Sequence, residues 1–335
     1  MIKKYVNKQI VALLATAMIV LTGCGSQASV SDNSASVNEV SENTIVEENE
    51  EKELWSMESV MEQVGGEYVN TEDDKAAITA LYDTDYKPVD GFDEEIEGVD
   101  YGERIQIVYY STTTERDRQA NVILPPGYDE NETYPVLYLL HGIGGDESEW
   151  FLGAPEEIIG NLVANGDVVP FITVVPNVRA RANDHDSSDV YSAGNIEAFN
   201  NFINDLQYDL MPYINENFNV YTDREHTAIC GLSMGGMESL SIGFQLLDVF
   251  GYIGAFSPAP SLDTTLLYVP DGYEAPIYLL ICTGDSDSVV FDNPYDYHTV
   301  LAANNVEHTF YFVPGGDHNF FVWNEGLYTF VKNIF

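Results

Sequence analysis

A serine in a glycine-rich turn has the clearest potential for chemistry in this chain. The segment Gly231-Leu232-Ser233-Met234-Gly235-Gly236 matches the pattern Gly-x-Ser-x-Gly. The apolar run 227–230 before it predicts a buried strand, and residues 237–247 after it have the pattern of a helix. An ordinary Gly/Ser turn is the alternative, but the flanking strand and helix favour a turn that exposes Ser233 as a nucleophile.

A nucleophilic serine needs a base. His318 ends the segment Pro314-Gly315-Gly316-Asp317-His318, which follows a predicted strand at 308–313. A solvated surface histidine is the alternative. The glycines and the position after a late strand favour the base, because triads of this type run in the chain order Ser, Asp or Glu, His.

The base in turn needs an acid to orient it, and one loop offers two. Gly284-Asp285-Ser286-Asp287 follows a predicted buried strand at 277–282. The usual spacing Gly-x-x-Asp selects Asp287 as the acid. Asp285 is then a turn former, and it remains the alternative acid.

A fourth component would stabilise the negative charge of the reaction intermediate. The apolar strand predicted at 135–140 runs into His141-Gly142-Ile143-Gly144-Gly145. Glycines let this backbone approach a substrate closely. We therefore expect the backbone N–H groups of Ile143 and Met234 to form an oxyanion hole, with His141 as a structural residue of the loop.

These residues belong to longer stretches that resemble a known family. The run from Tyr138 to Trp150 resembles the esterase D-like carbohydrate esterases of family 1, and it is most similar to bacterial feruloyl esterase domains attached to xylanases. The resemblance covers roughly residues 100 to 335. Four further stretches carry it: Ala120 to Tyr128, Tyr221 to His226, Gly231 to Gly236 and Gly315 to Trp323.

The resemblance implies an α/β-hydrolase fold, with a mostly parallel central sheet and helices on both faces. It also implies Ser233 as nucleophile, His318 as base, and plant cell-wall xylan esters as substrates. The serine-esterase reaction itself needs no metal or organic cofactor. The family usually has Gly-Thr-Asn/Glu-Asp at the acid loop, whereas this chain has Gly284-Asp285-Ser286-Asp287. The loop 177–194 matches nothing closely, so the acyl group stays open.

Three aromatic residues are candidates to line a substrate cleft. They are Trp150, Tyr191 and Trp323, which lie near glycine-rich loops or in the unmatched loop. Aromatic residues in such places also serve simply as packing. An open aromatic cleft would suit ferulate, and a cramped pocket would suit acetate.

The N-terminus has the features of a lipoprotein signal peptide. Three lysines precede an apolar stretch at 10–21, which is short for a membrane span. Leu21-Thr22-Gly23-Cys24 then resembles a lipoprotein cleavage box. We expect a signal peptide at 1–23, lipid on Cys24, and an exported protein anchored at the bacterial cell surface. The alternative is an ordinary secretory signal with a chance cysteine.

The remainder divides into three parts. Residues 24–53 are rich in Ser, Asn and Glu, without aromatic residues, which predicts a disordered tether. Residues 54–100, with short helices expected at 55–61 and 76–81, form a lead-in packed on the core. Residues 101–335 form one α/β-hydrolase domain. Within that domain the helical pattern at 195–217 contains Pro212, which should kink or restart the helix.

Cysteine content and charge limit the possible structure and partners. Cys230 and Cys282 are predicted on strands that a third strand at 252–256 separates, so we expect free thiols rather than a disulfide. The formal net charge of −42 should repel nucleic acid. This charge is compatible with a neutral polysaccharide as substrate, and it also helps to keep an exported protein in solution. Nothing in the sequence sets the oligomeric state.

The preferred hypothesis is a surface-anchored serine esterase that removes feruloyl groups from xylan. An acetylxylan or broad small-acyl esterase is the alternative within enzymes. A catalytically inactive carbohydrate-binding lipoprotein is the alternative from another class. All triad residue types occur in the expected order, which favours an active enzyme.

Overall fold

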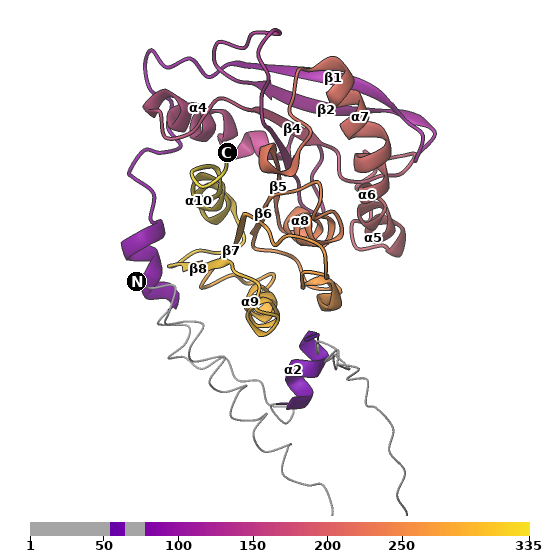
Figure 1. Cartoon of the computed structure of the whole chain (residues 1–335), viewed down its shortest axis with the longest axis vertical. Coiled ribbons are helices and arrows are strands. Elements are labelled where there is room, and N and C mark those ends of the chain that lie inside the picture. The colour runs from indigo at the N-terminus through magenta and orange to yellow at the C-terminus, as the bar shows by residue number, and fades with distance from the viewer. Residues whose placement is uncertain (1–53, 64–77) are drawn as a thin grey trace, which may run out of the picture.

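A single eight-stranded sheet forms the centre of the molecule (Figure 1). The computed structural model describes residues 54–63 and 78–335. The predicted signal peptide at 1–23, the tether at 24–53 and the lipid site Cys24 lie outside the described residues. In the described part, no helix is both long enough and apolar enough to cross a membrane.

The strands are almost all parallel. Their spatial order is β1-β2-β4-β3-β5-β6-β7-β8. The β1–β2 hairpin at one edge is antiparallel, as is the pairing of β2 with β4, and every pairing from β4 to β8 is parallel. The strands are β1 (Glu103–Ser111), β2 (Arg116–Leu124), β3 (Val136–Leu140), β4 (Ile172–Pro176), β5 (Thr227–Leu232), β6 (Tyr252–Phe256), β7 (Tyr278–Gly284) and β8 (Thr309–Val313).

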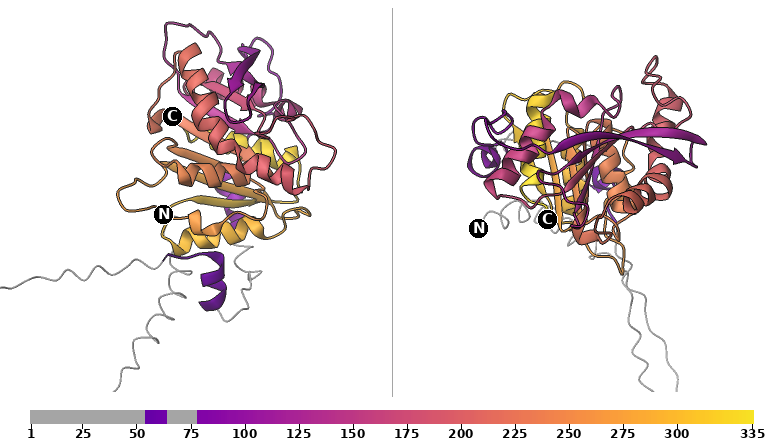
Figure 2. Two further views of the ribbon diagram at one scale, coloured as in Figure 1. Left: turned by 90° about the vertical axis from the view of Figure 1, so that its right-hand side faces the viewer. Right: turned by 90° about the horizontal axis from the view of Figure 1, so that it is seen from above.

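Helices cover both faces of the sheet, which confirms the predicted fold class (Figures 1 and 2). One face carries α4 and α10, and the other carries α5 to α9. The helices are α2 (Met57–Gln63), α4 (Pro155–Asn165), α5 (Ala193–Asn200), α6 (Phe202–Asp205), α7 (Met211–Asn217), α8 (Met234–Gln245), α9 (Asn293–Ala303) and α10 (Phe320–Val331).

The alternation of side chains along the strands builds two separate cores. On β3, Tyr138 and Leu140 pack into the core beneath α8, whereas Leu137 and Leu139 pack into the core beneath α4 and α10. Successive strand residues point to opposite faces, so a strand covered on both sides must be apolar throughout. All five residues of β3 are buried accordingly.

The predicted helix at 195–217 is interrupted once, at Asn201, between α5 and α6. From 202 to 217 the backbone is helical without a break, through α6, a π-helical turn at Leu206–Leu210, and α7. Pro212 lies just after the π-helical turn, and such turns accommodate a residue that cannot donate the usual hydrogen bond. The expectation that the proline restarts the helix is therefore wrong, because the π-helical turn carries the helix past it.

The described parts of the lead-in segment contact the domain at several places. Near its start, the backbone of Trp55 exchanges two hydrogen bonds of 2.8 Å with the side chain of Asn304. Residues 78–81 are helical and continue into a π-helical turn at Tyr82–Tyr86. The ring of Tyr86 stacks on Tyr311 of β8 with centroids 4.7 Å apart.

The two described cysteines are free and buried, as predicted. Cys230 lies on β5 and Cys282 on β7, with β6 between them. Burial in the apolar core raises the pKa of each thiol, so both are inert core residues.

Candidate active site

The serine lies on a strained turn between β5 and α8. Its backbone has φ +52° and ψ −118°, a conformation that residues with a side chain rarely adopt. The helix begins at Met234, earlier than the predicted start at 237, because the two glycines after it can enter the first turn. A Cβ atom on Gly235 would lie 2.4 Å from the carbonyl oxygen of His141, so only glycine lets these segments approach.

Three predicted residues meet in one hydrogen-bonded chain. His318 Nε2 lies 2.9 Å from Ser233 Oγ, and His318 Nδ1 lies 2.9 Å from Asp287 Oδ2. The three come from the ends of β5, β8 and β7, which are brought to one edge because the strands are parallel. This is the arrangement in which a histidine can take a proton from a serine while a carboxylate holds the ring.

The carboxylate of Asp287 is held ionised. Burial alone would raise its pKa, but hydrogen bonds from His318 and from the backbone N–H groups of Val290 and Val289 outweigh burial and lower that pKa. Each backbone group lies 3.0 Å from Oδ1, which leaves Oδ2 for the histidine. A buried anion beside Nδ1 fixes the tautomer that leaves Nε2 free to accept a proton.

The other aspartate of the loop has a different position. Asp285 Oδ1 accepts hydrogen bonds from the Gly315 N–H group at 2.8 Å and from Ser286 Oγ at 3.0 Å, and it does not contact His318. It therefore braces the turn. Asp317, which the sequence analysis did not single out, joins the two loops, because its Oδ1 accepts from the N–H groups of Ser288 and His318. The position of Asp317 directly before His318 was the feature of the sequence that could have indicated this role.

The two proposed oxyanion donors have no partner of their own. In the described part of the chain, the N–H groups of Ile143 and Met234 have no hydrogen-bond acceptor. The Met234 group opens α8, where the first N–H groups have no intrahelical acceptors. A Cβ atom on Gly142 would lie 3.4 Å from the Cβ atom of Ser233, so the loop rests against the nucleophile. Free donors beside a nucleophile can stabilise an oxyanion.

Side chains that the sequence analysis missed hold this loop. The buried guanidinium of Arg179 donates hydrogen bonds to the carbonyl oxygens of Ile143, at 3.4 Å, and of Gly145. Glu149 Oε2 accepts from the Gly142 N–H group at 2.7 Å. Arg179 lies in the unmatched loop 177–194, and no local pattern pairs it with a loop more than thirty residues away.

His141 has the structural role that was predicted. It is fully buried, and its Nε2 accepts a hydrogen bond of 2.8 Å from the Val178 N–H group. Its Nδ1 lies 2.7 Å from the Gly142 carbonyl oxygen and must carry the proton. Desolvation by burial lowers its pKa to about 4, so the ring is neutral and takes no part in proton transfer at neutral pH.

The three aromatic candidates occupy three different environments. The prediction that Trp150 lines a cleft is wrong, because its side chain is fully buried and its Nε1 donates to the Leu140 carbonyl oxygen at 2.9 Å. The Trp323 ring lies edge-on to the His318 ring, with centroids 5.1 Å apart. Tyr191 is 79% exposed on the loop before α5, away from every triad contact that the structure shows.

One group of metal-ligating side chains lies outside the triad. Asp146 and Glu147, at the end of the oxyanion loop, come together with His185.

Comparison with known proteins agrees with this geometry. The Esterase family model ("Putative esterase") matches residues 111–324. Over 251 residues the chain is 31% identical to an endo-1,4-beta-xylanase/feruloyl esterase of Xylanibacter ruminicola, covering 71% of this chain and 32% of that protein. It is 28% identical to endo-1,4-beta-xylanase Y of Acetivibrio thermocellus, covering 42% of this chain and 13% of that protein. The chain thus spans a third or less of these two relatives.

A solved structure matches over a larger share. A CE1 ferulic acid esterase of the anaerobic fungus Anaeromyces mucronatus superposes with a TM-score of 0.66 and 37% identity. The match covers 74% of this chain and 96% of that protein, and a second structure of the same esterase holds ferulic acid. The family match, the fold and the serine-centred site lead to one conclusion: this chain belongs to the esterase family, with the carbohydrate esterases of family 1, and is a serine ester hydrolase of the α/β-hydrolase fold.

Proposed function

We propose that this esterase removes feruloyl groups from plant cell-wall xylan, with Ser233, His318 and Asp287 as its catalytic triad. The observation that carries the proposal is the hydrogen-bonded chain from Ser233 Oγ through both nitrogens of His318 to Asp287 Oδ2. The likeness to a CE1 ferulic acid esterase supports the choice of acyl group. The names of the xylanase relatives support the choice of polymer.

The first half of the reaction forms an acyl-enzyme. Ser233 Oγ attacks the ester carbonyl carbon while His318 Nε2 takes its proton. Asp287 stabilises the imidazolium that results. The N–H groups of Ile143 and Met234 donate to the oxyanion, and one such donor contributes on the order of 3 kcal/mol to transition-state stabilisation. The first half ends when His318 gives its proton to the oxygen of the departing sugar alcohol, the ester C–O bond breaks, and the acyl group stays on Ser233.

The second half releases the acid. A water molecule attacks the acyl-enzyme while His318 Nε2 takes its proton, and His318 then returns a proton to Ser233 Oγ as the acid leaves. Every proton in this scheme is carried by residues of the chain, and no step needs a cofactor.

Turnover of two substrates tests the acyl specificity. The full chain would be assayed with methyl ferulate and with 4-nitrophenyl acetate, using Ser233→Ala as the blank. We expect turnover of both substrates by the native chain. Turnover of acetate alone would favour an acetylxylan or small-acyl esterase. Turnover of neither by a folded protein would favour a carbohydrate-binding lipoprotein.

We further propose that the enzyme is exported and held at the cell surface by lipid on Cys24. The lysines, the apolar stretch and the Leu-Thr-Gly-Cys box support this placement. The full chain and its Cys24→Ser variant would be expressed in a bacterial host with an alkyne-labelled fatty acid. The native chain should take up label and partition into detergent, and the variant should do neither. Equal labelling of both would contradict the proposal.

A further inference from the structure

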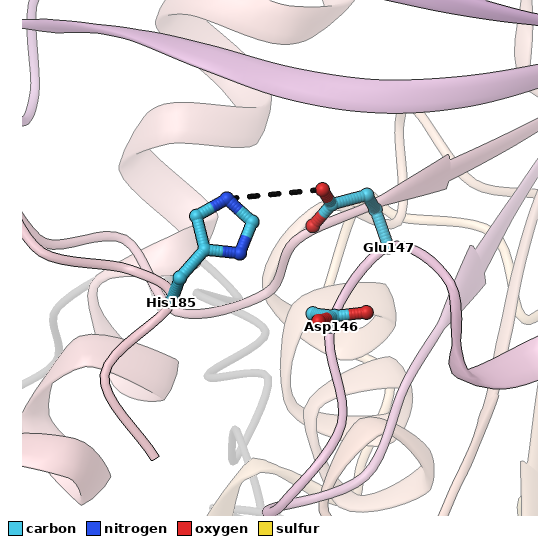
Figure 3. Close-up of side chains that lie close together, drawn as sticks. All are labelled: Asp146, Glu147 and His185. Atoms are coloured by element: carbon cyan, nitrogen blue, oxygen red, sulfur yellow. Dashed lines mark ion pairs between the residues drawn. The ribbon is translucent and has the colours of Figure 1, made fainter.

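A group of three potential ligands lies at the end of the oxyanion loop, outside the triad. Figure 3 shows the His185 ring directed at the carboxylate of Glu147, with Asp146 beside them. One ligand atom from each residue lies within 4.8 Å of the other two. His185 Nε2 is 3.8 Å from Glu147 Oε1, too far for a hydrogen bond.

Glu147 is buried and turns one oxygen toward His185. Only 6% of the residue is exposed. Its Oε2 accepts a hydrogen bond of 3.2 Å from Asn177 Nδ2, and its Oε1 faces His185. A carboxylate that is largely withdrawn from water is stabilised by a nearby cation.

The nearby arginines make their hydrogen bonds and ion pairs with other groups, although the charge of Arg179 also acts on Asp146 and Glu147 through space. The guanidinium of Arg118 pairs with Asp184 and Asp205, and that of Arg179 binds backbone carbonyl oxygens. Within the described residues, no ion pair joins Asp146 or Glu147 to an arginine. The acidity of the whole chain also favours a cation here.

A fourth ligand lies within reach. Asp184 Oδ1 is 3.8 Å from His185 Nε2, and it is the other oxygen, Oδ2, that binds Arg118. The set is thus one imidazole and two or three carboxylates. Zn²⁺ accepts this mixture at about 2.0–2.2 Å, whereas Ca²⁺ and Mg²⁺ prefer oxygen ligands alone.

We propose that Asp146, Glu147 and His185, with Asp184 as a further ligand, form a binding site for one Zn²⁺ ion. Ligand atoms around a tetrahedral ion at this bond length are separated by roughly 3.4 Å. The distances of 3.8 Å from His185 Nε2 to Glu147 Oε1 and to Asp184 Oδ1 therefore need to shorten only slightly. The His185 side chain is 53% exposed and can make that movement.

The site would join the loop of Ile143 to the loop that supports it. Asp146 and Glu147 directly continue the loop of Ile143, and His185 belongs to the same loop as Arg179, whose guanidinium binds the Ile143 carbonyl oxygen. A bound ion would therefore cross-link the donor loop to the loop that supports it. This role does not depend on which acyl group the enzyme removes.

Calorimetric titration tests the site. The full chain, first treated with a chelator, would be titrated with Zn²⁺ in about 0.15 M salt with excess Mg²⁺ to occupy weak carboxylate sites. We expect one Zn²⁺ per chain and a rise in melting temperature with Zn²⁺. His185→Gln and Glu147→Gln should each weaken binding by about 10- to 100-fold.

A matched variant controls for surface histidines. His226 forms the other exposed histidine–carboxylate contact, with its Nδ1 2.6 Å from Asp223 Oδ1. His226→Gln should bind Zn²⁺ as the native chain does. The proposal is overturned if no one-to-one binding occurs, or if His185→Gln binds as tightly as the native chain. Because His185 is exposed, that variant should fold, and its near-UV circular dichroism would verify this.

Discussion

The proposed triad and the proposed oxyanion loop lie at one edge of the sheet but are held in place differently. The N–H groups of Val289 and Val290 orient the carboxylate of Asp287, and the backbone of Ser233 is held by its own turn and by hydrogen bonds with Phe256 and Ala259. The oxyanion loop relies in part on the Arg179 side chain from a loop more than thirty residues away. Backbone groups thus position the proposed nucleophile and acid, whereas a long side chain supports the loop that carries the proposed donor.

Removal of the nucleophile should have the largest effect. Ser233→Ala is expected to lower kcat by about 10⁶-fold, because the remaining groups cannot form an acyl-enzyme. The fold should be unchanged, since alanine meets the same backbone strain as serine. Single-turnover assays with an unfolding curve as control would measure both quantities. Turnover within tenfold of the native rate would rule out the assignment.

The acid loop offers the next largest effect and an internal control. Asp287→Asn should lower kcat by about 10⁴-fold, because the histidine loses the anion that fixes its tautomer. Asp285→Asn removes the same charge from the same loop but should change kcat only a few-fold. The two variants would be compared by kcat/KM under identical conditions. A larger loss for Asp285→Asn would reverse the two roles.

Arg179 tests the oxyanion loop. Arg179→Ala should lower kcat by roughly 10- to 100-fold with little change in KM. The Ile143 N–H group would lose its support, and this group is expected to stabilise the negative charge of the transition state rather than the bound substrate. Added guanidinium at low concentration should restore part of the rate. Arg181→Ala, which removes a neighbouring arginine bonded to its own loop, is the matched control. If Arg179→Ala changes only KM or only the stability, and added guanidinium restores no activity, the role of Arg179 is purely structural.

A buried carboxyl on α8 should affect stability but not catalysis. Burial raises the pKa of Glu238 from 4.5 to about 8, so the folded state holds its proton more tightly than the unfolded state. Stability must then fall as pH rises from 4.5 to 8, by at most ~1.4 kcal/mol per pH unit. Glu238→Gln should gain stability over the native chain across that window and show no gain below it.

Urea unfolding at several pH values would measure this difference. The exposed Glu216→Gln variant on α7 serves as the control and should follow the native curve. A constant difference between Glu238→Gln and the native chain at all pH values would contradict the titration account. A loss of activity would show that α8 couples to the nucleophile more tightly than its contacts indicate.

The range of the sequence signals explains what could be predicted. The strand–turn–helix pattern around Ser233 and the glycine-rich loops before Asp287 and His318 are short-range signals, and they identified the residues that meet in the structure. The assignment of Trp150 to a cleft was wrong because its burial comes from packing against Phe256 and Phe320, far away in the chain. The contact of Arg179 with the oxyanion loop likewise had no local signal.

The backbone of Ser233 has a consequence for how this esterase can evolve. Its positive φ angle is one that glycine adopts freely and serine only under strain. A Ser233→Gly chain, although inactive, should be more stable than the working enzyme. Selection for stability alone would thus favour glycine at this position, and the proposed nucleophile costs the enzyme stability.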